Sequence, residues 1–252
     1  MILRRLGNKA KIAKKIQEYF PPHKIYIEPF FGAGGMFFNK PKAKYNIVND
    51  LDSDVFNLFQ VVMNQKEELE KAFYMMPIHS DLLNYWKVNE ETDPIKKAVR
   101  FLFLSNLTWM GKMDTLDLGS KNKKQTSDYI DATFEYLYEV KFCNFGFDKF
   151  IKSIQFYQSD PNDCFTYNDG PYLGTVDNYS NSFTEQDSFD LFEVNQNTGC
   201  KWAMSEFDHP FILEQAKERG LNVHIIGERQ NLKNRRVEIL VTNYDNNQLK
   251  LF

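Results

Sequence analysis

The chain has 252 residues, of which 42% are hydrophobic, 26% are charged and 15% are aromatic. This length suits one large domain, or one domain with a smaller insertion, and the apolar fraction excludes a globally disordered chain. A mean hydropathy of −0.51 goes against a membrane protein, and no apolar run approaches the roughly 20 residues of a spanning helix.

The distribution of charge is more informative than its total. The net charge of −3 by itself goes against a nucleic-acid-binding protein. Basic residues nevertheless gather in three segments, 1–15, 121–124 and 229–236. Such patches are compatible with contacts to phosphates, and solvated helix or loop faces explain each patch equally well.

The N-terminal sequence and the cysteines bear on the compartment. Residues 1–15 are rich in lysine and lack the apolar core of a secretory signal, so we do not expect secretion. Cys143, Cys164 and Cys200 lie far apart without a CxxC pair, which predicts reduced thiols and no metal site. We therefore expect a cytoplasmic protein.

Hydrophobic periodicity and turn signals predict the elements in chain order. We expect helices at 8–20, between about 52 and 107, at 129–142, 184–194 and 210–219, and strands at 24–28, 45–49, 154–157, 165–168, 201–205, 223–226 and 237–242. The alternation after residue 150 indicates βαβ units and a mostly parallel sheet, whose last two strands are able to pair antiparallel. This predicts an α/β body formed by 1–60 and 150–252, interrupted by a helical insertion at 61–149.

A glycine-rich turn follows the first expected strand. Residues 28–35 read EPFFGAGG, and glycines at such a position let the backbone approach a ligand closely. The GxGxxG spacing of dinucleotide sites is not met, because Phe37 stands where the third glycine belongs. Asp50 ends the next strand, where acids accept hydrogen bonds from ribose hydroxyls in doubly wound folds. The alternative for Asp50 is an N-cap of the following helix.

A second group of residues follows the strand at 165–168. Residues 168–172 read NDGPY, a turn that carries an acid and an aromatic residue at the carboxyl end of a strand. Asp169 and the Gly170 carbonyl are able to accept hydrogen bonds from one amino group, and Tyr172 is able to stack on the ring that bears it. An ordinary Asp-Gly-Pro turn is the alternative.

Taken together, the two groups resemble the Dam-like N6-adenine-specific DNA methyltransferases, in which an EPFxGxG loop binds S-adenosylmethionine and a DPPY loop holds a flipped adenine. Four further stretches agree with the resemblance: residues 3–9, Asn49-Asp50, Ser159-Asp160 and residues 231–244. The resemblance covers nearly the whole chain except about 65–150. It implies a Rossmann-like, seven-stranded, S-adenosylmethionine-dependent methyltransferase fold with a helical target-recognition insertion.

The same resemblance implies roles for individual residues. The implied catalytic residues are Asp169, Gly170, Pro171 and Tyr172. The implied cofactor-binding residues are Arg5, Lys9, Glu28, Phe30, Gly32, Gly34, Asp50 and Asp160. No metal is implied. The family has proline at the position of Gly170, which keeps the backbone carbonyl but makes the loop less rigid.

We place DNA recognition in residues 105–128. The segment lacks the arginine of the family's Gly-x-x-Arg pattern, so the target sequence stays open. Trp109 and Met110 are candidates to stack on or wedge between bases, and a core position in the insertion is the alternative for Trp109. The expected phosphate contacts are Lys112, Lys121, Lys123 and Lys124.

The last five residues, QLKLF, resemble the peptide by which bacterial DNA-processing proteins bind the replication sliding clamp. Physically, such a peptide presents one polar anchor and an apolar pair to a hydrophobic pocket. The residues concerned are Gln248, Leu249, Leu251 and Phe252. The alternative is a tail that packs on this protein's own core.

The expected activity is transfer of a methyl group from S-adenosylmethionine to the N6 amine of adenine in double-stranded DNA, as in restriction–modification. Two alternatives remain open. Gly170 motivates a catalytically impaired DNA-binding relative, and related loops motivate a methyltransferase acting on RNA or on a protein glutamine.

Overall fold

The computed structural model describes residues 2–3, 8–111, 114–117, 123–155, 161–174, 183–230 and 235–245. Of residues 110, 123, 229, 230 and 235 it describes the backbone alone.

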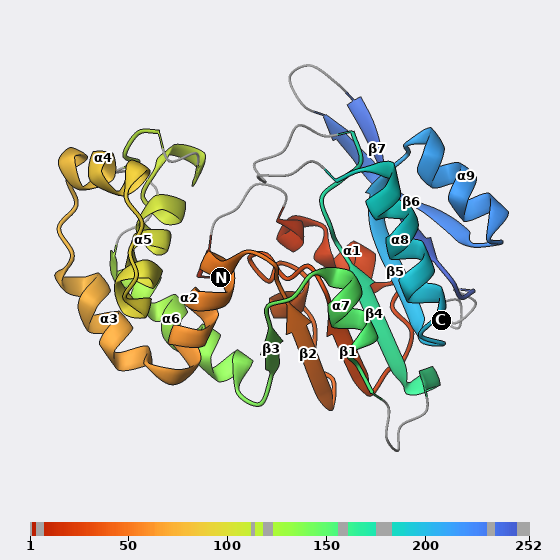
Figure 1. Cartoon of the computed structure of the whole chain (residues 1–252), viewed down its shortest axis with the longest axis horizontal. Helices are drawn as coiled ribbons and strands as arrows, with labels where there is room; N and C mark the ends of the chain where they lie inside the picture. Colours follow the sequence, from red (N-terminus) through yellow and green to blue (C-terminus); the bar gives the residue numbers. More distant parts are fainter. Residues whose placement is uncertain are drawn as a thin grey trace.

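Within these residues, seven strands form one sheet, in the order β3-β2-β1-β4-β5-β7-β6 (Figure 1). The strands are β1 (Ile25–Glu28), β2 (Tyr45–Asn49), β3 (Lys141–Cys143), β4 (Cys164–Asn168), β5 (Lys201–Phe207), β6 (Asn222–Gln230) and β7 (Arg235–Thr242). The first five run parallel, and β7 lies antiparallel between β5 and β6. This confirms the seven-stranded Rossmann-like methyltransferase architecture, including the antiparallel final pair.

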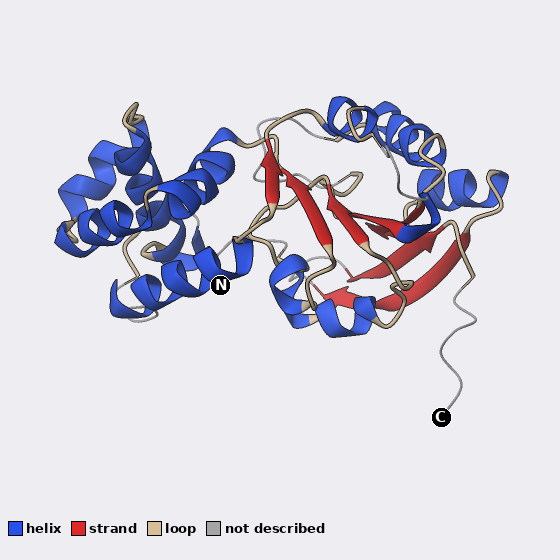
Figure 2. Ribbon diagram, turned by 90° about the horizontal axis from the view of Figure 1, so that it is seen from below, coloured by secondary structure: helices blue, strands red, loops and turns tan. Residues whose placement is uncertain are grey.

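Helices cover both faces of the sheet (Figure 2). Side chains alternate between the faces along β1: Tyr26 packs in one hydrophobic core and Ile25 and Ile27 in the other. The Tyr26 face is covered by α1 (Ala13–Gln17). The opposite face is covered by α7 (Phe147–Lys152), α8 (Glu185–Gln196) and α9 (Pro210–Glu218). Both faces are therefore buried, as parallel sheets require.

A group of helices lies beside the β3 edge of the sheet (Figure 1). It consists of α2 (Ser53–Asn64), α3 (Lys66–Met75), α4 (Ser80–Val88), α5 (Pro94–Asn106) and α6 (Lys123–Leu137). Short 3₁₀ turns occur at η1 (Lys9–Lys11), η2 (Phe37–Asn39), η3 (Trp109–Gly111) and η4 (Pro161–Asp163). Phe31 joins the helices to the sheet, since its ring centroid lies 5.0 Å from those of Phe59 in α2 and Phe142 in β3.

The structure differs from the sequence-based expectation in two helices and two strands. The helix expected at 8–20 is the turn η1 followed by the short α1, and the helix expected at 129–142 is α6, which begins and ends earlier. From the sequence we expect residues 141–149 within the helical insertion, whereas Lys141–Cys143 pair with β2 as an edge strand. Three residues are too few to show the alternation of apolar and polar residues that predicts a strand, so this strand is recognised only from its hydrogen bonds with β2. We also expect a strand at 154–157, but residues 154–155 are not in a strand and the other two lie outside the described residues.

None of the helices in the described part of the chain combines the length and hydropathy that a bilayer-spanning segment requires. The three cysteines are free thiols; Cys164 and Cys200 are buried and Cys143 is half-buried. Among the described residues, no three His, Cys, Asp or Glu side chains are grouped in a way that would hold a metal ion.

Candidate active site

The two loops singled out from the sequence meet at one edge of the sheet. Strands β1 and β4 are parallel neighbours, with Ile25 opposite Cys164 and Ile27 opposite Thr166. Residues 29–35 follow β1 and are named the cofactor loop, after the role that the resemblance implies for them. Residues 169–174 follow β4 and are named the catalytic loop for the same reason. Both therefore leave the carboxyl ends of adjacent strands where the strand order reverses, which is where doubly wound sheets bind ligands.

The cofactor loop is shaped by two glycines and one carboxylate. Gly32 and Gly34 have φ angles of 54° and 70°, a left-handed conformation that residues with a Cβ adopt at a cost. The Asp50 Oδ2 atom accepts a hydrogen bond from the Gly32 amide at 2.6 Å. The acid at the tip of β2 thus holds the loop that follows β1.

The alternative in which Asp50 caps the following helix is wrong, because Asp52 is the N-cap of that helix. Asp52 is the N-cap of α2, and its side chain accepts hydrogen bonds from the amides of Asp54 and Val55. The second oxygen of Asp50 accepts instead from the Asp52 amide at 2.8 Å. Asp50 therefore connects the cofactor loop with the start of α2.

Glu28 lies beneath the cofactor loop. Its side chain is 2% exposed, and it accepts a hydrogen bond from the Tyr26 hydroxyl at 2.8 Å. Burial raises the pKa of Glu28 well above its ordinary value, and the bond from Tyr26 opposes this only in part. Glu28 is therefore a buried carboxyl group at the last position of β1, directly before the cofactor loop.

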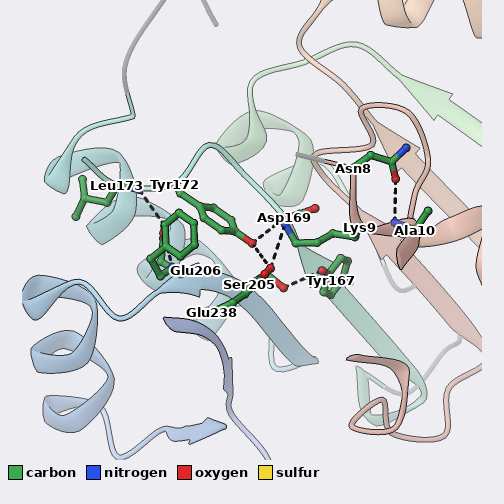
Figure 3. Close-up of polar contacts among 11 residues, drawn as sticks. Asn8, Lys9, Ala10, Tyr167, Asp169, Tyr172, Leu173, Ser205, Glu206 and Glu238 are labelled. Atoms are coloured by element: carbon green, nitrogen blue, oxygen red, sulfur yellow. Dashed lines mark hydrogen bonds and ion pairs between the residues drawn. The ribbon is translucent and has the colours of Figure 1, made fainter. Parts of the chain in front are cut away.

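The N-terminal segment crosses the cofactor loop and delivers Lys9 to the site (Figure 3). Asn8 caps η1 by accepting a hydrogen bond from the Ala10 amide at 2.9 Å. A Cβ atom at Gly35 would lie 2.0 Å from the Asn8 Oδ1 atom, so only glycine permits this crossing. The Lys9 side chain that follows is 2% exposed.

Lys9 joins a buried polar group at the catalytic loop (Figure 3). Its Nζ atom lies 2.7 Å from Asp169 Oδ1 and 3.4 Å from Glu238 Oε1. The Tyr172 hydroxyl lies 2.9 Å from the same Glu238 oxygen and 3.4 Å from Asp169 Oδ1. Burial raises the pKa of Tyr172, so the hydroxyl stays protonated and donates a hydrogen bond to Glu238.

Glu206, at the end of β5, supports the catalytic loop from below. Its carboxyl oxygens accept hydrogen bonds from the amides of Leu173 at 3.1 Å and Phe207 at 2.8 Å. Burial raises the pKa of Glu206 to about 8, the two amides oppose the shift, and the charge of Asp169 adds to it. A neutral carboxyl group at pH 7 therefore lies beside the Lys9–Asp169 ion pair.

Three aromatic rings, those of Phe30, Phe147 and Phe183, pack together beside the two loops, tilted or edge-on to one another. The Phe30 ring centroid lies 5.7 Å from that of Phe147 in α7 and 6.2 Å from that of Phe183. A Cβ atom at Gly170 would lie 3.3 Å from the Phe30 Cζ atom, so this ring covers the glycine. This aromatic group therefore connects Phe30 of the cofactor loop with the start of α7 and with the catalytic loop.

The recognition segment forms a short hairpin after α5. Thr108 and Leu116 make an antiparallel bridge, the Trp109 amide donates to the Thr115 carbonyl at 2.8 Å, and the Asp117 amide donates to the Leu107 carbonyl at 2.8 Å. The Trp109 side chain is 58% exposed, so the alternative of a core position for it is wrong.

Several sequence-predicted residues cannot be placed. Arg5, Asp160, Lys112, Lys121, Gln248, Leu249, Leu251 and Phe252 lie outside the described residues, as does the side chain of Lys123. Lys124 is exposed at the start of α6. Pro171 lies in the catalytic loop and is half-buried.

Four residues of this site escape sequence reasoning: Glu206, Glu238, Phe147 and Phe183. The two glutamates carry a signal, because each is an acid directly beside a large apolar residue within a strand, and an acid is rarely buried without a partner. The two phenylalanines carry none, since a chain with 23 phenylalanines offers many equivalent candidates.

A comparison with protein-family models identifies the family of this chain. The model of the D12 class N6 adenine-specific DNA methyltransferases matches residues 6–237, which include the cofactor loop and the catalytic loop. The chain belongs to this family. The match extends through the helices α2 to α6.

Individual relatives support the assignment to different extents. The DNA adenine methylase of Salmonella typhi is 30% identical over 115 residues, which cover 43% of this chain and 41% of that protein. The chain thus matches less than half of the length of that methylase. The type II methyltransferase M1.LlaDCHI of Lactococcus lactis subsp. cremoris is 24% identical, covering 95% of this chain and 94% of that protein.

A solved structure, the rRNA methyltransferase aviRa from Streptomyces viridochromogenes, covers 92% of this chain and 84% of its own. The TM-score of this comparison is 0.36, and the sequences are 8% identical.

Proposed function

We propose that this chain transfers a methyl group from S-adenosylmethionine to the N6 amine of an adenine in double-stranded DNA. The observation that carries the proposal is the meeting of the two loops, with the Phe30 ring over Gly170 and the Asp169 carboxylate beside it in the sequence. A cofactor held by the first loop and a base held by the second would lie side by side.

The residues at the β1 and β2 tips fit S-adenosylmethionine. The Asp50 carboxylate lies at the β2 tip, where acids of doubly wound folds accept hydrogen bonds from ribose hydroxyls, and it also holds the amides of Gly32 and Asp52. A Cβ atom at Gly32 would meet no atom within 4 Å, so the loop backbone faces open space. Phe30, Phe147 and Phe183 supply apolar ring faces for a purine.

In the proposed reaction, the catalytic loop holds the target amine. The Asp169 carboxylate and the Gly170 carbonyl accept hydrogen bonds from the two N–H groups of the amine. The lone pair of the amine nitrogen then points away from these two acceptors. S-adenosylmethionine supplies the electrophilic methyl group. Positioning of the amine is the main contribution of the protein, and positioning effects of this kind account for several kcal/mol of a barrier, about 7 or more in favourable cases.

The target adenine must leave the DNA stack to reach this loop, at a cost of a few kcal/mol. We propose that the helices α3 to α6 and the hairpin at 107–117 form the recognition unit. Trp109 is an exposed aromatic side chain on the hairpin that would stack on a base or fill the vacated space, an interaction worth roughly 1–3 kcal/mol.

The decisive experiment is incorporation of tritiated methyl groups from S-adenosylmethionine into plasmid DNA, followed by sequencing of the methylated adenines. We expect Asp169→Ala to reduce incorporation at least roughly 100-fold while cofactor affinity stays within a few-fold. Asp190→Ala, at an exposed position on α8, is the matched control and should match the unmodified protein.

Two results would contradict the proposal. Cofactor binding without incorporation into any DNA would favour the catalytically impaired relative that Gly170 motivates. Preferential incorporation into RNA or into a protein, in competition with duplex DNA, would assign a different substrate.

A further inference from the structure

The ammonium group of Lys9 occupies the place that the proposed function assigns to the target amine. The Nζ atom lies 2.7 Å from Asp169 Oδ1, the oxygen that would accept from the base. It also lies 4.4 Å from the centroid of the Tyr172 ring, over the face on which the base would stack. In the free protein the Lys9 ammonium group therefore already occupies the Asp169 acceptor and the face of the Tyr172 ring.

Lys9 cannot simply move into water when a base enters. Its side chain is 2% exposed and is enclosed by the N-terminal segment and the catalytic loop. A buried ammonium group that loses its carboxylate is strongly disfavoured. Entry of the base therefore requires a second acceptor within reach of the same lysine.

Glu238 provides that acceptor. Its Oε1 atom lies 3.4 Å from Lys9 Nζ, farther than Asp169 but within ion-pair distance, and its side chain is 3% exposed. The residue lies on β7 opposite Phe207 of β5, so the sheet fixes its position. The Tyr172 hydroxyl donates to the same oxygen at 2.9 Å, which ties Glu238 to the catalytic loop as well.

We infer that Lys9 takes the place of the adenine amine in the free protein and that Glu238 is the positioning residue that receives the ammonium group when the base enters. This inference rests on the proposed function. No covalent bond changes in the exchange: one donor replaces another at Asp169, and Lys9 moves from the nearer carboxylate to the farther one. Both carboxylates thus keep a donor throughout.

The test uses Glu238→Gln, which keeps the size of the side chain and an oxygen that accepts from Tyr172 but removes the charge that would receive Lys9. We expect the kcat/KM for DNA to fall at least about 10-fold, mainly through a raised KM, because Lys9 stays on Asp169 and competes with the base. The Kd for S-adenosylmethionine should stay within about 2-fold, the usual error of independent sites. Glu193→Gln, which removes a surface partner of Arg219, is the matched control.

A double-mutant cycle with Lys9→Met shows whether Glu238 acts through the lysine. Without an ammonium group to receive, adding Glu238→Gln should change kcat/KM less than about 2-fold. An equal loss in both backgrounds would overturn the inference, because a purely structural glutamate behaves in that way. If Lys9→Met does not fold, Lys9→Gln serves, as a neutral side chain that still bonds to Asp169.

The outcomes separate the inference from the function on which it rests. If the unmodified protein methylates DNA and Glu238→Gln does so with unchanged KM and kcat, the inference alone is overturned. If the unmodified protein methylates no DNA, the proposed function fails and the inference fails with it.

Discussion

The ring of Phe30 lies over Gly170, so the cofactor loop and the catalytic loop are in direct contact. A Cβ atom at position 170 would lie 3.3 Å from Phe30 Cζ, closer than side chains usually approach. The glycine thus permits the ring to lie closer to the loop backbone than any other residue would. Glycine also makes the catalytic loop more flexible than the family's proline would, because a glycine loop has more unfolded and mobile states to restrict.

Two substitutions at position 170 separate contact from stiffness. Gly170→Ala adds a Cβ and should displace Phe30 by a few tenths of an ångström, lowering both cofactor affinity and turnover. Gly170→Pro adds the same atom but also fixes φ, so its turnover should exceed that of the alanine variant. The two variants are compared by single-turnover methyl transfer with saturating cofactor. Equal rates would mean that loop stiffness does not limit transfer.

Asp50 and Asp52 form a matched pair of acids two residues apart. Asp50→Ala should weaken S-adenosylmethionine binding about 10-fold or more, because hydrogen bonds to a charged acceptor are worth about 1.5–3 kcal/mol each. Asp52→Ala should instead remove the α2 cap and cost about 1 kcal/mol of stability, with cofactor affinity unchanged. Isothermal titration calorimetry and thermal melting check both. The reverse pattern would return the cap role to Asp50.

The exposed Trp109 and the buried Trp86 offer a second matched pair. Trp109→Ala should raise the KM for DNA several-fold while stability changes by no more than about 0.5 kcal/mol. Trp86 packs edge-on against Phe103 and donates to Glu91, so Trp86→Ala should lower stability by about 3–5 kcal/mol. DNA titrations and chemical denaturation measure the two effects. An unchanged KM for Trp109→Ala would place the stacking group elsewhere.

Glu206 makes stability depend on pH. Its pKa is raised from 4.5 to about 8 in the folded protein, so between these values the folded state holds a proton that the unfolded chain has released. The free energy of unfolding therefore falls as pH rises through this range, by up to roughly 1.4 kcal/mol per pH unit for this group.

Glu206→Gln removes this titration. The variant keeps only one acceptor for the two amides of Leu173 and Phe207, so it should be less stable than the unmodified protein at pH 5. The difference should shrink toward pH 8, where the unmodified protein bears the cost of a buried charge. Urea denaturation at several pH values tests this, with Glu193→Gln as the surface control. Parallel stability curves would assign the titration to another group.

The sequence by itself determined the parts of this protein that depend on local order. The EPFFGAGG and NDGPY segments each follow an apolar strand, and glycines, proline and the strand pattern are sufficient to place both at the carboxyl edge of a parallel sheet. The strands that end at Asn49 and Asn168 and the helices near 184–194 and 210–219 were predictable for the same reason, because their periodicity is long enough to be read.

Only the tertiary structure decided which side chains meet. Lys9, Asp169 and Glu238 are separated by most of the chain, and nothing in their spacing indicates that one ammonium group lies between two carboxylates. The three-residue strand β3 likewise exists because β2 offers it hydrogen bonds, since its own residues carry no strand periodicity. Both follow from the same physical fact: burial and pairing energies depend on distances across the fold, and local sequence patterns report only on neighbours along the chain.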